Sequence, residues 1–145
     1  MSMEEIAKEA NISKSGIYWH FKNKDELLKH LFAKYSPFME LNKLIISTLE
    51  SGDPPDIKEL IKKIIEAFDE RYAVSRLSFS EILKGGVGNA IVYKGEIEKF
   101  IYIVAKLITD NTEKGIFRKI DPFIMIVSVM GTIFQLLLAK NVVFT

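Results

Sequence analysis

Basic and hydrogen-bonding side chains gather in one short stretch near the start of this 145-residue chain. Lys14, Lys22 and Lys24 occur there together with His20, and residues 11–24 include no acidic side chain. Cationic groups without a nearby carboxylate suit the phosphate backbone of a nucleic acid. The ordinary alternative is a lysine-rich surface that contacts only water.

Capping residues divide this region into three short helices. Ser2 followed by Glu5 has the spacing of a capping box, in which each side chain satisfies a free backbone amide at a helix start. The first helix is expected to end before Asn11, because asparagine tolerates the positive φ of a helix terminus. Ser13 and Asn23 are the expected N-caps of the next two helices. Two short helices joined by a tight turn form a helix-turn-helix, whose second helix enters the DNA major groove.

The same residues resemble a known family. The run I-A-x-x-A-x-x-S-K-S-G-I-Y-W-H-F-K-N-K-x-E-L-L is similar to the DNA-binding segment of the tetracycline-repressor (TetR-type) regulators, most specifically in its Y-x-H-F-K-x-K core. The resemblance covers about a quarter of the chain. It implies an all-α protein with a helix-turn-helix head in residues 1–35 and a helical effector-binding and dimerisation body in residues 36–145.

DNA contact is implied for six residues of the head. They are Lys14, Ser15, Gly16, Tyr18, His20 and Lys24. Lys14 and Ser15 lie at the start of the second helix, where side chains and free amides reach base edges or phosphates. Gly16 permits a close backbone approach where family members often carry Thr or Ser.

Each of these assignments competes with a structural alternative. Tyr18 also fits core packing, and His20 also fits a solvated surface. Trp19 is expected to stack on the edge of the head. The core of the head is expected to contain Ile6, Ala7, Ile12, Ile17 and Phe21.

Apolar periodicity and breaker residues predict five helices in the body. Their expected ranges are 39–49, 57–72, 75–83, 90 or 92 to 113, and 123–139. The glycine cluster that begins at Gly85 is expected to be a plain loop, because no strand precedes it and no Gly-Lys-Ser/Thr follows.

A small-molecule effector inside the body is a further implication of the resemblance. The candidate lining residues are aromatic: Phe68, Tyr72, Phe79, Tyr93, Phe100, Tyr102 and Phe134. Aromatic residues at helical spacing more often fill a core than line a pocket. Arg71 and Arg76 are candidates for an anionic effector, with surface ion pairs as the ordinary alternative.

The last predicted helix, residues 123–139, carries no charge. It is shorter than the roughly 20 apolar residues that a membrane span needs, and it contains polar side chains. We therefore expect a soluble helix that is buried on most sides at a subunit interface of a homodimer. A stripe of small or polar residues at helical spacing would let the partner helix approach closely: Ser128, Gly131, Thr132, Gln135 and Ala139.

The composition of the chain argues against several other classes of function. The net charge is +1 and 48% of the residues are apolar, so the chain can bury a core and is not a general basic coat for nucleic acid. Cysteine is missing and both histidines lie in the head, so we expect no enzyme, metal or cofactor and assign the protein to the cytoplasm. The family pattern has a further helix at each end, so we expect the natural product to be longer. The competing hypothesis is a helical module for protein interaction or small-molecule binding whose head is incomplete and does not bind DNA.

Overall fold

The computed structural model describes residues 2–85 and 94–143, without the side chain of Ile82. This part of the chain contains helices and turns and no strand, which confirms the prediction of an all-α protein. The helices are α1 (Met3–Glu9), α2 (Lys14–His20), α3 (Lys24–Tyr35), α4 (Phe38–Ser51), α5 (Ile57–Glu70), α6 (Tyr72–Lys84), α8 (Glu96–Glu113) and α9 (Pro122–Val143).

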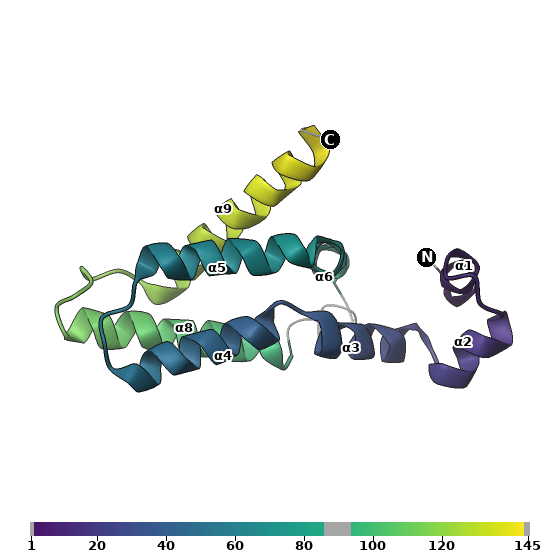
Figure 1. Ribbon diagram of the computed structural model, residues 1–145, viewed down its shortest axis with the longest axis horizontal. Coiled ribbons are helices and arrows are strands. Elements are labelled where there is room, and N and C mark those ends of the chain that lie inside the picture. Colours follow the sequence, from purple (N-terminus) through teal and green to yellow (C-terminus); the bar gives the residue numbers. More distant parts are fainter. Residues whose placement is uncertain (1, 86–93, 144–145) are drawn as a thin grey trace.

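Helices α1 and α2 and the start of α3 form the head, at one end of the long axis of the molecule (Figure 1). The capping box is present: the Ser2 amide donates to Glu5 Oε2 at 2.6 Å, and the Glu5 amide donates to Ser2 Oγ at 3.2 Å. Asn11 has a φ of 54°, as its place after α1 required. The core of the head consists of Met3, Ala7 and Ile17, with Ile6, Phe21 and Leu27 half-buried around them.

Ile12 corrects one prediction about this core. Its side chain is 46% exposed, although the apolar pattern assigned it to the interior. The residue lies in the turn between α1 and α2, where its amide donates to the Ala7 carbonyl at 3.0 Å. This hydrogen bond ties the backbone of the turn to α1, and the side chain of Ile12 is left outside.

Helix α3 joins the head to the rest of the molecule. It buries Leu28 and Phe32 against Val74 and Leu77 of α6 and against Ile97. Pro37 ends this helix and is the N-cap of α4, because proline lacks the amide that a helix interior needs but tolerates a helix start. The chain therefore passes from α3 into a separate helix α4 instead of continuing as one kinked rod.

The main core lies between α4, α5, α8 and α9. Phe38 is central to it: its ring lies 5.2 Å from that of Phe68 and 5.1 Å from that of Phe100, both in edge-on arrangements. Such aromatic pairs add to the free energy gained by burying apolar area. At the surface Arg71, which separates α5 from α6, donates to Glu40 Oε2 at 3.0 Å and lowers the pKa of that carboxyl through this hydrogen bond. Arg71 is thus engaged in an ion pair within the protein.

Helix α8 begins at Glu96, several residues later than predicted. The residue before it, Gly95, has a φ of 90°, a conformation that side chains other than that of glycine rarely adopt. The predicted start at position 90 or 92 lies outside the described residues. The predicted glycine loop also does so, except for Gly85.

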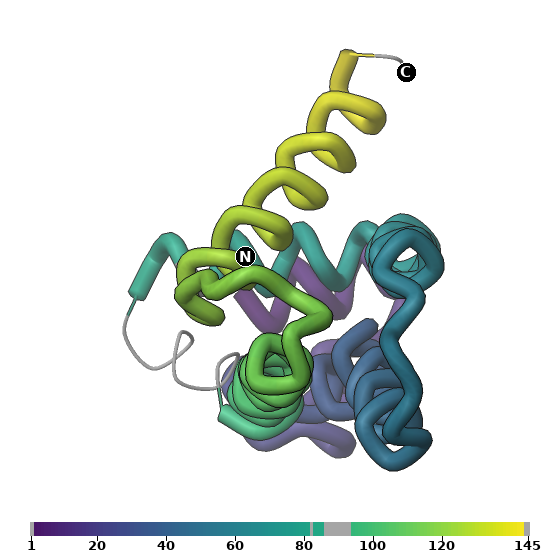
Figure 2. The backbone as a smooth tube through the Cα atoms, turned by 90° about the vertical axis from the view of Figure 1, so that its left-hand side faces the viewer, coloured from purple at the N-terminus to yellow at the C-terminus, as the bar shows by residue number. Residues whose placement is uncertain are grey.

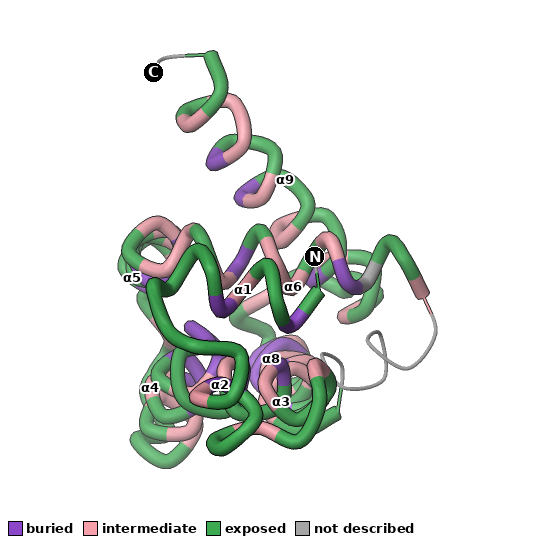
Figure 3. The backbone as a smooth tube through the Cα atoms, turned by 90° about the vertical axis from the view of Figure 1, so that its right-hand side faces the viewer, coloured by how far each residue is buried: buried purple, intermediate pink, exposed green. Residues whose placement is uncertain are grey.

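Helix α9 is longer than predicted and extends away from the body (Figures 1 and 2). It buries Ile126, Ile133 and Leu137, while only 17% of its most apolar stretch is buried, as the largely exposed tube in Figure 3 shows. One protomer covers only one side of this helix, so the expected burial on most sides would require a partner helix. By length and composition alone, α9 is also long and apolar enough to cross a membrane.

Candidate nucleic-acid interface and body cavities

Helix α2 presents most of its surface to solvent. Its buried residue is Ile17, which anchors it to α1, and Ser13 Oγ caps it by accepting from the Gly16 amide at 3.0 Å. Lys14 and Ser15 are exposed at the N-terminal end, where free backbone amides also point outward. Tyr18 is 41% exposed and Trp19 is 86% exposed, so neither aromatic ring is a core residue. The N-terminal end and one side of α2 are therefore open to a ligand.

Gly16 has a local role in this geometry. A Cβ atom at this position would lie 3.0 Å from Ser13 Oγ, which is closer than ordinary van der Waals contact. Glycine therefore leaves room for the capping hydroxyl beside the backbone. It also leaves this position of the first turn of α2 without a side chain, so that another molecule can approach the backbone closely.

The remaining two candidate contacts lie at the other end of α2 and just beyond it. His20 is exposed on the last turn of α2, and Lys24 is half-buried at the first position of α3. The turn between them is held by the Lys22 amide, which donates to Glu26 Oε2 at 2.6 Å. The structure thus presents these two side chains on either side of a turn that a side-chain hydrogen bond holds.

Glu4 is a participant that the sequence pattern did not reveal. Its carboxylate lies 2.9 Å from Lys14 Nζ and accepts a long hydrogen bond of 3.5 Å from the Tyr18 hydroxyl. The hydrogen bond to Lys14 lowers the pKa of Glu4, and Glu4 in turn raises the pKa of Lys14. A carboxylate on α1 therefore holds two of the candidate contact residues of α2 and adds a negative charge beside them.

We expect Glu4→Gln to strengthen binding to duplex DNA about two- to fivefold, most clearly at low salt. The physical reason is that Lys14 is released and a charge that repels phosphate is removed, while an exposed ion pair contributes little to the fold. Fluorescence anisotropy over a salt series measures the effect. The matched control is Glu9→Gln, an exposed carboxylate on the same helix. Weaker binding of Glu4→Gln would show that the carboxylate orients Lys14 productively instead of competing with DNA.

One cavity of the body has a volume of about 290 Å³, and we call it the larger cavity in contrast to the cavity of about 80 Å³ described below. It lies among α4, α5, α6, α8 and α9, and four of the aromatic candidates line it: Phe68, Phe79, Phe100 and Phe134. Ser75 and Ser78 of α6 also line it, and sequence reasoning missed both. Their spacing matches that of Phe79 on the same helix face, which is the signal that could have found them.

The other aromatic candidates do not join this cavity. Tyr72 packs against the main core and does not line the cavity. Tyr102 is 71% exposed on the outer face of α8, so its assignment to a cavity is wrong. Tyr93 lies outside the described residues.

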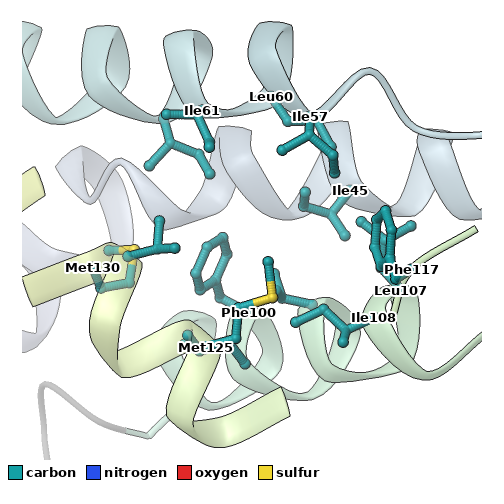
Figure 4. Close-up of a pocket in the computed structure, with 14 residues that line it drawn as sticks. Ile45, Ile57, Leu60, Ile61, Phe100, Leu107, Ile108, Phe117, Met125 and Met130 are labelled. Carbon is teal, nitrogen blue, oxygen red and sulfur yellow. The ribbon is translucent and has the colours of Figure 1, made fainter. Parts of the chain in front are cut away.

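The smaller cavity measures about 80 Å³ and is lined by apolar residues of α4, α5, α8 and α9 and by Phe117. Figure 4 shows Ile45, Ile61, Phe100 and Met130 among the side chains around it. Phe100 and Met130 also line the larger cavity, so they stand between the two. A methionine in such a wall adapts easily to a change of contents on either side.

The small-residue stripe of α9 lies mostly at the surface. Ser128, Gly131, Thr132 and Gln135 are exposed, and Ala139 is half-buried beside α5. Large apolar side chains flank the stripe on the same helix, including Ile124, which is 61% exposed, and Leu136, which is 54% exposed. Gly131 additionally lines the larger cavity.

Acidic and histidine side chains do not cluster in a way that could hold a metal ion, within the residues that the structure describes. The arrangement instead offers an exposed cationic helix and an apolar cavity. Both features suit binding.

Two comparisons with known proteins bear on this geometry. Residues 1–31 match the family described as "Bacterial regulatory proteins, tetR family". Over 81 residues the chain is 31% identical to a protein of Shigella flexneri named "HTH-type transcriptional regulator AcrR"; the match covers 44% of this chain and 38% of that protein. The chain therefore spans less than half the length of this curated relative. The family match coincides with the capped helices that present Lys14 and its neighbours.

Proposed function

From the premise that this chain belongs to the tetR family of bacterial regulatory proteins, we propose that it is a dimeric, ligand-responsive transcriptional repressor of the cytoplasm. It would bind a pseudo-palindromic DNA operator and release it when a small molecule enters the body. The work is binding and not catalysis. The observation that carries the proposal is the exposed, capped helix α2, whose N-terminal end presents Lys14 and Ser15 outward from the head.

DNA contact would begin with the phosphates. Lys14 and Lys24, at the starts of α2 and α3, would take phosphate groups, while Tyr18 and His20 would add hydrogen bonds along the backbone. Ser15 would contact base edges in the major groove, and the missing side chain at Gly16 would allow the first turn of α2 to approach them closely. These contacts fix the register of the helix, and the base contacts supply sequence preference.

Dimerisation would use the uncovered side of α9. An operator with two half-sites separated by about 34 Å requires two heads related by a two-fold axis. The exposed stripe of Ser128, Gly131, Thr132 and Gln135 allows two helices to approach closely, and the flanking apolar side chains would be buried by the approach. Burial of these side chains would also remove the membrane-like character of an isolated α9.

Ligand response would pass through α6. One face of this helix lines the larger cavity through Ser75, Ser78 and Phe79, and the other packs through Val74 and Leu77 on α3. Because α3 continues directly into the head, a ligand that moves α6 would also move α3 and so change the separation of the two DNA-reading helices. A ligand acts in this way only if it binds one arrangement more tightly than the other.

The direct test is fluorescence anisotropy with the DNA upstream of the protein's own gene. We expect tight binding, with the logarithm of the binding constant falling linearly with the logarithm of the salt concentration. We also expect this DNA to be clearly preferred over scrambled DNA of equal length. Binding without any sequence preference would reject the regulatory function. A complete lack of binding at low salt would reject it as well.

Thr132→Lys is expected to convert the dimer into monomers. It places a charged side chain in the middle of the exposed stripe, where a close helix–helix contact would bury it without a partner. Sedimentation velocity would show the mass falling toward the 16.6 kDa of a single chain. Ser47→Lys on the exposed side of α4 adds the same charge and is expected to leave the dimer intact. A Thr132→Lys protein that remains dimeric would show that the interface lies elsewhere.

A further inference from the structure

The size of the larger cavity limits what it can hold. A cavity of roughly 150 Å³ lined by Leu, Ile and Phe stays dry and accommodates one benzene molecule. The cavity between α6 and α9 has a similar lining, and its volume of about 290 Å³ is nearly twice as large. Two fused rings would therefore fill it, whereas a single ring would leave part of it empty.

The walls favour flat aromatic molecules. Five phenylalanine rings line the cavity: Phe38, Phe68, Phe79, Phe100 and Phe134. The rings of Phe79 and Phe134 lie 4.0 Å apart at an interplanar angle of 32°, so α6 and α9 meet through an aromatic contact at its edge. A ring entering the cavity can stack on or meet the edges of these side chains, which aliphatic walls would not allow.

Charged ligands are disfavoured by the same walls. None of the described residues that line the cavity is charged. The nearest buried carboxylate along α6, Glu81, is not a lining residue and accepts a hydrogen bond of 2.9 Å from Lys84. A charged group in the cavity would lose its hydration without gaining a partner.

Two hydroxyl groups supply the polar contacts of the lining. Ser75 Oγ donates to the Arg71 carbonyl at 3.0 Å, and Ser78 Oγ donates to the Val74 carbonyl at 2.9 Å. With their protons used within α6, these oxygens are left with lone pairs that accept hydrogen bonds. They would therefore select a ligand that carries one O–H or N–H donor.

We infer that the effector of this cavity is an uncharged aromatic molecule of about two fused rings that carries a single hydroxyl or N–H donor. The inference rests on the proposed ligand response and gives it a chemical class. The ring system would lie among the phenylalanines, and its donor would point to Ser78.

The test uses three fluorescent probes of nearly equal shape: 2-naphthol, 2-naphthoate and 2-naphthylmethylammonium. At neutral pH the first is uncharged, the second is an anion and the third is a cation. Titration of the full chain is expected to show 2-naphthol binding at least about tenfold more tightly than either ion. Equal or tighter binding of the anion or the cation would overturn the inference, as would failure of 2-naphthol to bind.

Two substitutions test whether the probe binds in this cavity. Ser78→Leu fills the space and is expected to weaken 2-naphthol binding about tenfold, whereas Ala73→Leu on the exposed side of α6 should not. Ser78→Ala keeps the space and removes the acceptor, so it is expected to erase the preference for 2-naphthol over naphthalene. Because this second change is small, it keeps the test valid even if Ser78→Leu does not fold. An unchanged preference in Ser78→Ala, together with unchanged affinity in a folded Ser78→Leu protein, would place the probe elsewhere and overturn the inference.

DNA binding is measured separately with the same probes. If 2-naphthol binds with the expected selectivity but does not release the operator, the ligand class stands and the proposed ligand response fails. If an ion releases the operator and 2-naphthol does not bind, the ligand response stands and the class is wrong.

Discussion

Lys14→Ala combined with Lys24→Ala is expected to weaken operator binding by about 100-fold at physiological salt. Lys14 is exposed at the start of α2, and Lys24 occupies the first position of α3, so both cations flank the open end of the DNA-reading helix. A dimer presents each residue twice, and the double change therefore removes four phosphate contacts. Each lost contact lowers the salt slope by about 0.9, so the slope should fall by about 3 to 4.

The salt slope makes this prediction specific to phosphate contact. The matched control is Lys58→Ala combined with Lys119→Ala, which removes the same charge from exposed positions of the body. This control should alter affinity only slightly, because charges farther than a Debye length of about 8 Å from the DNA are screened. Far-UV circular dichroism would establish that both proteins keep their helices.

The same pair of proteins separates the two candidate functions. A helical interaction module without DNA binding would keep its activity in the Lys14→Ala, Lys24→Ala protein. A double variant that binds the operator as tightly as the original chain, with an unchanged slope, would show that α2 is not the DNA-reading helix.

Phe100→Ala is expected to lower the free energy of unfolding by about 3 to 5 kcal/mol. Phe100 is 2% exposed, contacts the ring of Phe38 and lines both body cavities. Its removal would join the two cavities, and the surrounding helices could not collapse fully into the space. Since domains of this kind are stable by about 5 to 15 kcal/mol, the loss is a large share of the total.

Urea denaturation followed by circular dichroism measures this effect, at one fixed protein concentration because dimerisation adds to the apparent stability. Tyr102→Ala is the matched control: it removes an aromatic side chain from the same helix at a position that is 71% exposed. We expect it to change the stability by no more than about 0.5 kcal/mol. Similar losses for the two variants would mean that α8 faces its neighbours differently.

The local architecture of the head was available from the sequence. The Ser2–Glu5 capping box, the turn at Asn11 and the caps at Ser13 and Asn23 all act within four residues, and each appears in the structure at the expected place. Hydrogen bonds of this range depend on residue order alone, so the motif and its helices could be predicted together. The assignment of Ile12 to the core was wrong because the residue lies in a turn, where helical periodicity does not indicate which way a side chain points.

The contacts that decide function are not local, and only the tertiary structure established them. The Glu4–Lys14 ion pair needs the packing of α1 against α2, and the larger cavity needs α4, α5, α6, α8 and α9 together. Periodicity assigned the phenylalanines to an inner face but could not say which of them border empty space, since that depends on how completely neighbouring helices interdigitate. For the same reason the apolar sequence of α9 indicated a face to be covered, while the fold decided that its own chain covers only one side.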